Sequence, residues 1–163
     1  MYYKSIYTSP IGAMSLVASD KGLRGVWLEG QKYFERGLEG QVRIAAHPVL
    51  DQVIQLLDAY FSGQIVDFSS LTLECVGTVF QKRVWKILQS IPTGQTITYG
   101  QIAKQLDIRS GQAVGGAVGR NPYSIIVPCH RVIGQKGQLT GYAGGVDRKI
   151  WLLRHENSTY STL

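Results

Sequence analysis

The fold of this chain is decided by residues 98–119, TYGQIAKQLDIRSGQAVGGAVG. Thr98 is followed by Gln101 in the spacing of a capping box, which predicts a helix over residues 99–106. Its buried side chains would be Ile102, Ala103 and Leu106. A second helix is expected over residues 111–119, because the Asn-Pro pair that follows disfavours its continuation. Two short helices joined by a tight connection are typical of a helix-turn-helix motif.

The second of these helices has almost no side-chain bulk. Gly115, Gly116 and Gly119 lie in or at the end of it, and an interior glycine costs about 1 kcal/mol relative to alanine. Close packing against a neighbouring helix or strand would explain them. The alternative is that the helix backbone must approach an external surface, such as a groove of DNA. Arg109 before the helix and Arg120 after it favour DNA.

Basic residues are concentrated in the same half of the chain. The protein has 163 residues and a formal net charge of +6. Residues 1–80 carry six basic and eight acidic side chains, whereas residues 81–163 carry eleven basic and three acidic ones. Such an asymmetry indicates an anionic partner, most often nucleic acid, although a solvated basic face would give the same composition.

The composition excludes several other classes of protein. An apolar content of 44% is that of an ordinary globular chain, and this length supports a core in one or two small domains. Cys75 and Cys129 form no CxxC pair, so we expect a reduced chain without a metal site, with Cys75 as a small buried hydrophobe. There is no signal peptide and no apolar run of ~20 residues, which predicts a cytoplasmic protein that does not contact membranes.

The N-terminal half has the pattern of a small α+β unit. Strand-like stretches over residues 2–8, 13–19 and 22–29 are separated by turn residues and predict an antiparallel meander. Apolar residues then recur at helical spacing from Pro48 until Gly63. A further strand is expected over residues 68–75.

From Gly77 onward the sequence has a capping box and apolar residues at helical spacing, so we expect an N-terminal domain over residues 1–76 and a C-terminal domain over residues 77–163. The latter begins with a second capping box, whose helix would stop before Pro92. Residues 131–142 contain three glycines and are typical of a β-turn or wing. A last helix is expected over residues 146–155. Its apolar side would consist of Val146, Ile150 and Leu153.

Residues 125–132, IIVPCHRV, are the most specific stretch of the sequence. We expect the apolar run to form a buried extended segment that presents Cys129 as a nucleophile, since thiolates react and nearby positive charge favours them. Neighbouring side chains of an extended segment point to opposite faces, so His130 would act through a turn or a bridging water. A third residue would orient that imidazole, and Glu156, at the end of the last expected helix, is a candidate among the three acidic residues after residue 80. Each residue also has an ordinary interpretation, as a core thiol, a structural histidine or a charge at a helix end.

The segment Val127-Pro128-Cys129-His130-Arg131-Val132 resembles the active-site signature of the O6-alkylguanine-DNA alkyltransferases, also called methylated-DNA–protein-cysteine methyltransferases. Other motifs of this family follow one another in the family order and cover nearly the whole stretch from residue 80 to residue 156. They are Thr98-Tyr99-Gly100-Gln101-Ile102-Ala103, Ala113-Val114-Gly115-Gly116-Ala117, Asn121-Pro122, Gly141-Tyr142-Ala143-Gly144-Gly145 and Lys149-Ile150-Trp151-Leu152-Leu153-Arg154-His155-Glu156. The N-terminal half resembles the family only loosely.

This resemblance implies a ribonuclease-H-like N-terminal domain followed by a winged-helix-like domain with a helix-turn-helix. It further implies a direct-repair protein that takes an alkyl group from the O6 of guanine in DNA, and less readily from the O4 of thymine. The acceptor would be Cys129, used once and irreversibly, with no cofactor. Family members bind double-stranded DNA through the minor groove, and we expect a monomer.

Roles for individual residues also follow from the resemblance. His130 would deprotonate Cys129 through a water, Glu156 would orient His130, and Asn121 would help hold the active-site turn. Tyr99 would donate to guanine N3 and crowd the phosphate while the nucleotide rotates out of the helix.

Two further sets of residues would bind the base and the DNA. The base pocket would be formed by Val118, Val132, Tyr142 and Ala143. The DNA surface would include Arg109, Gln112, Ala113, Gly115 and Arg120. The family commonly has an arginine immediately before the Ala-Val-Gly-Gly run, where it replaces the flipped nucleotide in the stack; here Gln112 occupies that position, so either Gln112 or Arg109 would fill the gap. Some members bind zinc in the N-terminal domain, but the cysteines of this chain cannot form that site.

Three other functions fit the sequence less well. A non-catalytic relative that binds alkylated DNA would carry tryptophan at the acceptor position, where this chain has Cys129. A cysteine hydrolase would need an oxyanion hole and a cleft unrelated to the basic half. A plain winged-helix regulator would leave the Pro-Cys-His-Arg sequence unexplained.

Overall fold

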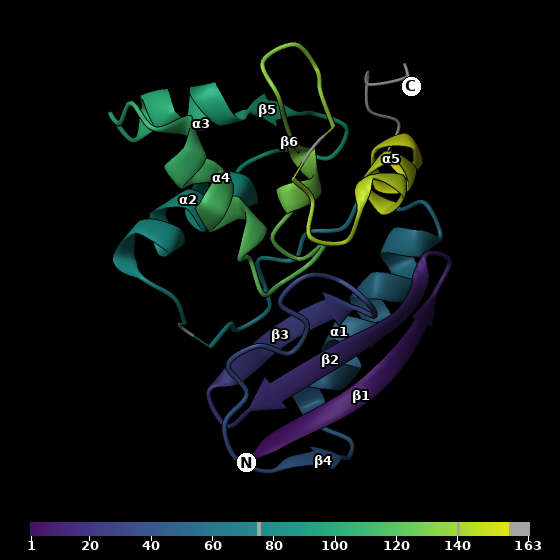
Figure 1. The fold of residues 1–163 in the computed structure, drawn as a ribbon. Coiled ribbons are helices and arrows are strands. Elements are labelled where there is room, and N and C mark those ends of the chain that lie inside the picture. Colours follow the sequence, from purple (N-terminus) through teal and green to yellow (C-terminus); the bar gives the residue numbers. More distant parts are fainter. Residues whose placement is uncertain (75, 140, 157–163) are drawn as a thin grey trace. The chain divides into compact units, whose positions relative to one another are not determined.

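The computed structural model describes residues 1–74, 76–139 and 141–156, and the chain divides into two compact units (Figure 1). The first unit comprises Met1–Val76 together with Pro122–Ser124, and the second comprises Gly77–Asn121 together with the chain from Ile125 onward. Both units contain strands and helices, as expected of the α+β class. Within the described ranges, no helix is long and apolar enough to cross a membrane.

A four-stranded sheet in the order β3-β2-β1-β4 forms the centre of the first unit. Its strands are β1 (Tyr2–Ser9), β2 (Gly12–Ser19), β3 (Gly22–Leu28) and β4 (Val42–Ile44). The first three form the antiparallel meander that the sequence predicts. The sequence did not predict β4, which pairs in parallel with the edge of β1. All three of its residues are exposed, so no alternation of apolar and polar residues marks it as a strand.

Helix α1 (Pro48–Phe61) packs against this sheet (Figure 1). It begins at the expected Pro48, because the fixed φ of proline suits the first helical position. It ends two residues before Gly63, whose φ of 100° leaves the helical region. The side chains that it buries are Leu50, Val53, Leu57 and Tyr60.

The expected strand over residues 68–75 is wrong, since the described part of this segment makes a single β-bridge. Leu73 forms this bridge with Leu23 of β3. The Leu23 amide donates to the Thr72 carbonyl at 2.8 Å, and the Glu74 amide donates to the Leu23 carbonyl at 2.8 Å. Cys75 lies outside the described residues. The apolar residues of this segment attach it to β3 without adding a strand.

The second unit contains the helix-turn-helix that residues 98–119 predict. It is formed by α3 (Tyr99–Gln105) and α4 (Gly111–Gly119), which pack together, and α4 also packs against α2 (Val79–Gln89). Helices α2 and α3 both begin with the expected capping box. The Trp85 indole donates to the Ala117 carbonyl at 2.8 Å and so ties α2 to α4.

Residues 131–139 form a short strand and a turn. The strand β6 (Val132–Ile133) pairs in parallel with β5 (Ile97–Thr98), which immediately precedes α3. Beyond it, the Gly134 amide donates to the Gln138 carbonyl at 2.8 Å, with Gly137 at a φ of 82°. The β-turn interpretation is therefore correct for this part of the wing.

The expected apolar side of the last helix, α5 (Val146–His155), is partly wrong. Leu153 is buried as expected, but Val146 is 43% exposed and Ile150 only half-buried. The buried side chains are Lys149, Leu152 and Leu153. The Lys149 amine donates to the carbonyl of Val132 inside the unit, so a charged residue occupies the buried side of the helix. Counting apolar residues alone could not find this orientation.

Candidate active site

The backbone around Cys129 forms a tight buried turn. Cys129–Arg131 is one turn of 3₁₀ helix, η1, in which the Arg131 amide donates to the Pro128 carbonyl at 3.0 Å. The Cys129 amide donates to the Val127 carbonyl at 2.8 Å, and the Asn121 side-chain amide donates to the same oxygen at 2.7 Å. Asn121 therefore holds the turn directly before the thiol. The preceding residues are buried as expected, but they are not extended, because Ile125 has a φ of 71°.

His130 and Glu156 meet inside the second unit. Nε2 of His130 lies 2.7 Å from Oε2 of Glu156. The Arg131 guanidinium binds both oxygens of this carboxylate, with Nε at 2.8 Å from Oε1 and Nη2 at 3.0 Å from Oε2. Its Nη1 donates to the Ile91 carbonyl at 2.7 Å. Bidentate contacts of this kind fix the carboxylate in both position and plane.

The charges of this cluster determine which nitrogen of His130 carries a proton. Burial alone would raise the pKa of Glu156, but the charges and hydrogen bonds of His130 and Arg131 lower it below its usual range. Burial lowers the pKa of His130 despite the adjacent carboxylate, so the imidazole is neutral at pH 7. A neutral imidazole that donates from Nε2 to Glu156 has its lone pair on Nδ1. Nδ1 is buried and makes no hydrogen bond to any described residue, so it can accept a proton.

Cys129 is only 5% exposed, and burial raises the pKa of its thiol. A hydrogen bond from Asn121 and the positive charge of Lys149 act in the opposite direction. The raised pKa means that the thiol form prevails near pH 7. A base is therefore needed to produce the thiolate nucleophile.

Two residues of this cluster were missed at the level of sequence. Arg131 was seen only as part of a motif, whereas the structure makes it the second partner of Glu156. Lys149 is 0% exposed, and burial lowers its pKa to about 8. The Arg131 contact has no local signal in the sequence, because a buried carboxylate requires a cation but only the packing of α5 buries Glu156. Lys149 has none either, because lysines in helices are usually solvated.

Two tyrosines share the surroundings of Cys129. The negative charge of the Cys129 thiolate contributes, after burial, to raising the pKa of both Tyr99 and Tyr142. The Tyr142 hydroxyl is buried and makes no hydrogen bond to a described residue. Val118 and Val132 are also buried, and Ala143 is half-buried beside Tyr142.

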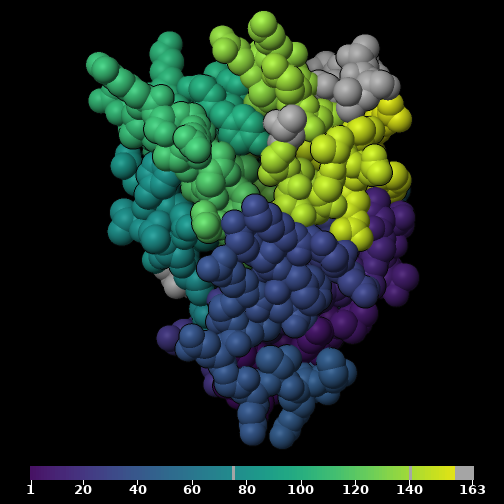
Figure 2. Space-filling view, in the orientation of Figure 1, coloured from purple at the N-terminus to yellow at the C-terminus, as the bar shows by residue number. Residues whose placement is uncertain are grey.

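The surface of α4 is open and lacks bulk. Figure 2 shows the atoms of the segment that includes α4, in green, at the surface of the second unit. Gln112 and Ala113 are exposed, as are Arg109 and Arg120 at the two ends. A Cβ added to Gly111 or Gly119 would meet nothing within 4 Å. At Gly115 and Gly116 it would lie 3.9 Å from Tyr99 Cε1 and 3.8 Å from Arg120 Nη1, which are ordinary contacts. Packing within the protein therefore does not require these glycines.

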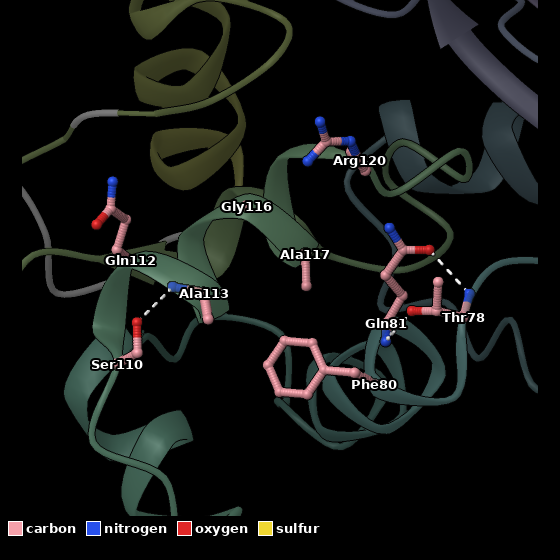
Figure 3. Close-up of a pocket in the computed structure, with 9 residues that line it drawn as sticks. All are labelled: Thr78, Phe80, Gln81, Ser110, Gln112, Ala113, Gly116, Ala117 and Arg120. Atoms are coloured by element: carbon pink, nitrogen blue, oxygen red, sulfur yellow. Dashed lines mark hydrogen bonds between the residues drawn. The ribbon is translucent and has the colours of Figure 1, made fainter.

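A pocket of about 490 Å³ lies between α4 and the start of α2 (Figure 3). Phe80 projects toward α4 from one side of it, and Arg120 lies at its edge (Figure 3). Its walls carry no acidic side chain. The lining residues are Thr78, Phe80, Gln81, Ser110, Gln112, Ala113, Gly116, Ala117 and Arg120. The sequence predicted Gln112, Ala113 and Arg120 on one surface, but it did not predict that the start of α2 lies beside them.

The described residues offer no group of three or more His, Cys, Asp or Glu side chains that could hold a metal ion. The groups gathered around the Cys129 thiol are an imidazole, a carboxylate, a guanidinium, an amine and two phenols.

Comparison with known proteins agrees with this geometry. Residues 1–75 match the family model of the 6-O-methylguanine DNA methyltransferase ribonuclease-like domain, and residues 79–158 match that of the DNA binding domain of the same family. A methylated-DNA–protein-cysteine methyltransferase of Methanosarcina acetivorans is 44% identical over 160 residues, covering 97% of this chain and 99% of that protein. One of Shigella flexneri is 45% identical and covers 91% of both chains.

Solved structures agree as well. Mycobacterium tuberculosis OGT in complex with DNA has a TM-score of 0.84 at 39% identity, over 97% of this chain and 96% of that one. The O6-methylguanine-DNA methyltransferase of Pyrococcus kodakaraensis has a TM-score of 0.72 at 26% identity, over 96% and 99%. The chain belongs to the 6-O-methylguanine DNA methyltransferase family.

Proposed function

We propose that this protein repairs DNA by taking the alkyl group from the O6 of guanine, and less readily from the O4 of thymine, onto the sulfur of Cys129. The names of its relatives support the class of reaction. The environment of Cys129 is the observation that supports this residue as the acceptor. A buried thiol with a raised pKa occupies the same turn as an imidazole whose Nδ1 can accept a proton.

His130 is the general base in this proposal. Glu156 holds the proton of the imidazole on Nε2, and Nδ1 takes the thiol proton through one water molecule. The carboxylate stabilises the imidazolium that forms, and Arg131 keeps the carboxylate in place. The positive charge of Lys149 favours the thiolate. Asn121 keeps the backbone directly before the sulfur from moving.

The transfer itself forms one bond and breaks one bond. The thiolate attacks the alkyl carbon, the C–S bond forms, and the C–O6 bond breaks with its electron pair going to the purine. The guanine takes up one proton, which balances the proton that left the thiol. The Tyr99 hydroxyl assists by donating a hydrogen bond to N3 of the base. The product on the protein is a thioether, from which the thiolate is a poor leaving group, so each molecule reacts once. No cofactor takes part.

The alkylated base enters a pocket formed by Val118, Val132, Tyr142 and Ala143 in this proposal. The buried hydroxyl of Tyr142 supports it, because a buried polar group without a protein partner suits a polar ligand. A base within a duplex must rotate out of the stack to reach such a pocket, which costs a few kcal/mol. Gln112 or Arg109 would fill the gap that it leaves.

We further propose that α4 enters the minor groove of double-stranded DNA and that a monomer suffices. Glycines that internal packing does not require support a close approach of the α4 backbone to another molecule. The exposed Arg109 and Arg120 suit the phosphates on either side. A reactive thiol must stay reduced, so we expect the protein to act in the cytoplasm.

The proposal is tested by incubation with a duplex that carries O6-methylguanine with a radiolabelled methyl group. We expect label on the protein at no more than one equivalent, and no label on Cys129→Ala. Cys75→Ala is the matched control, because it removes the other cysteine and should retain the transfer.

Each alternative gives a different result. Repeated turnover would indicate an enzyme with a regenerated nucleophile and would refute a consumed acceptor. Binding to the modified duplex without transfer would indicate a non-catalytic alkylated-DNA-binding protein.

A further inference from the structure

Two buried polar atoms of the second unit lack a hydrogen-bond partner among the described residues. They are Nδ1 of His130 and the hydroxyl of Tyr142, and no other buried side-chain nitrogen or oxygen in the described ranges shares this property. His130 is 0% exposed and Tyr142 is 9% exposed, so bulk solvent does not pair them. Leaving a buried polar group unpaired is costly, and each of these two atoms therefore needs an explanation.

The hydroxyl of Tyr142 lies close to the residues between which the thiol proton would move. After burial, the charge of the Cys129 thiolate has the largest effect on the pKa of Tyr142 and raises it, and the Glu156 carboxylate raises it further. The charge of Arg148 acts in the opposite direction. Such effects weaken with distance, so the hydroxyl is near both Cys129 and Glu156. Glu156 in turn contacts the imidazole of His130 at 2.7 Å.

The loop that carries Tyr142 is fixed at both ends. Gly141 and Gly145 have φ values of 76° and 94°, a region that suits glycine. The Gly145 amide donates to the Tyr142 carbonyl at 3.0 Å, and a Cβ on Gly141 would lie only 3.2 Å from the Tyr99 hydroxyl. The Gly145 carbonyl accepts from the Lys149 amide at 3.1 Å, which joins the loop to the first turn of α5. Tyr142 therefore cannot expose its hydroxyl to solvent unless this loop moves.

One bound water would satisfy both atoms. A buried water in a protein typically makes about three hydrogen bonds. The water that takes the proton of Cys129 to His130 has two of these partners, the thiol and Nδ1. The Tyr142 hydroxyl supplies the third, because its oxygen can accept the second hydrogen of that water. The pKa of Tyr142 is raised well above its usual value, so the phenol keeps its own proton at neutral pH.

We propose that the Tyr142 hydroxyl binds the water that carries the proton from Cys129 to His130, which makes Tyr142 a positioning residue for the transfer reaction. This inference rests on the proposed function. The water gives one proton to Nδ1 as it takes the thiol proton, so the water and Tyr142 both end unchanged. A water held by three partners stays aligned with the thiol and the imidazole, whereas a water held by two can rotate away. The aromatic ring of Tyr142 keeps its place in the base pocket of the proposed function.

The test is the substitution Tyr142→Phe, which removes one oxygen and keeps the ring. Because that oxygen makes no hydrogen bond to a described residue, we expect the variant to fold with little change in melting temperature. Its maximal rate of single transfer from O6-benzylguanine should fall about tenfold at neutral pH, with the half-saturating concentration unchanged. The deficit should vanish as the pH rises toward the raised pKa of Cys129, where the thiol ionises without a base. Tyr60→Phe, which removes a hydroxyl from a buried tyrosine of α1, is the control and should keep the wild-type rate.

Combining Tyr142→Phe with His130→Ala separates this role of the hydroxyl from others. If the hydroxyl acts only through the water to His130, the double variant should react as slowly as His130→Ala alone. Slowing that multiplies in the double variant would overturn the inference, as would a wild-type rate in Tyr142→Phe. A raised half-saturating concentration at an unchanged maximal rate would also overturn it, since the hydroxyl would then bind the base. Those results would leave the proposed function intact, whereas failure of the unsubstituted protein to transfer label to Cys129 would refute that function itself.

Discussion

Replacing Gly115 and Gly116 of α4 by alanine should stabilise the protein and weaken its binding to DNA. Both added methyl groups fit inside the protein, because the nearest atoms would be 3.9 Å and 3.8 Å away. Alanine is the better helix former by about 1 kcal/mol at each position. The double variant should therefore gain about 2 kcal/mol, and its melting temperature should rise by roughly 4–8 °C.

The effect on DNA binding has the opposite sign. If the α4 backbone lies against a groove, each methyl group overpacks the interface at a cost of about 1–3 kcal/mol. Since 1.4 kcal/mol is a factor of ten, we expect the Kd to rise about tenfold or more for each substitution. The free base O6-benzylguanine has no duplex to bind, so its reaction with Cys129 should keep its rate.

Thermal unfolding and fluorescence anisotropy with a labelled duplex measure the two effects. Gln55→Ala, at an exposed position of α1, is the control that raises helix propensity in the other unit without touching α4. A stabilised variant with unchanged Kd would refute the close approach of α4 to DNA. A destabilised variant would show that these glycines serve internal packing after all.

Four further results are expected. Gln112→Ala or Arg109→Ala should slow transfer from duplex DNA by about tenfold or more, and the residue that fills the stack should have the larger effect. Transfer from O6-benzylguanine should stay unchanged. Equal slowing with both substrates would refute a role of these residues in filling the stack. Affinity for DNA should fall steeply with salt, with a slope of about −0.9 in log K against log salt for each phosphate neutralised, and a flat response would exclude phosphate contacts. The transfer rate should already be near its plateau at neutral pH, because the lowered pKa of His130 keeps this base neutral there, whereas His130→Ala should show a rate that continues to rise with pH toward the raised pKa of Cys129. Because the folded-state pKa of Glu156 is lowered, its contribution to stability should be complete above its unfolded value of about 4.3 and lost as the pH falls further, and Glu156→Gln should flatten this acid limb of the unfolding curve.

Much of the fold could be predicted because its signals are local. The capping boxes at Thr78 and Thr98 act within one helical turn, so the starts of α2 and α3 follow from neighbouring residues. The turns between the first three strands are likewise set by residues next to them in the chain. Strand β4 and the bridge at Leu73 depend on distant partners, and their own residues carry no pattern that names those partners.

The active site likewise has features that the local sequence predicts and features that depend on distant contacts. The Cys-His-Arg sequence predicted Cys129 as the nucleophile and His130 as the base, and Glu156 was one of only three acidic residues after residue 80. The burial of Lys149 and the two contacts of Arg131 with Glu156 were not apparent, because both depend on where α5 packs. The expectation of an extended segment at Ile125 was also wrong, since Ile125 has a φ of 71° and the Asn121 side chain holds the turn that follows at Val127.

The sequence by itself determined the chemical reagents, the two-helix motif and the half of the chain that carries the positive charge. These are properties of residue type and short-range spacing. Only the tertiary structure decided the contact of His130 with Glu156, the raised pKa of Cys129 and the burial of Lys149. Burial and hydrogen-bond geometry produce those properties, and both arise only when segments far apart in the chain come into contact.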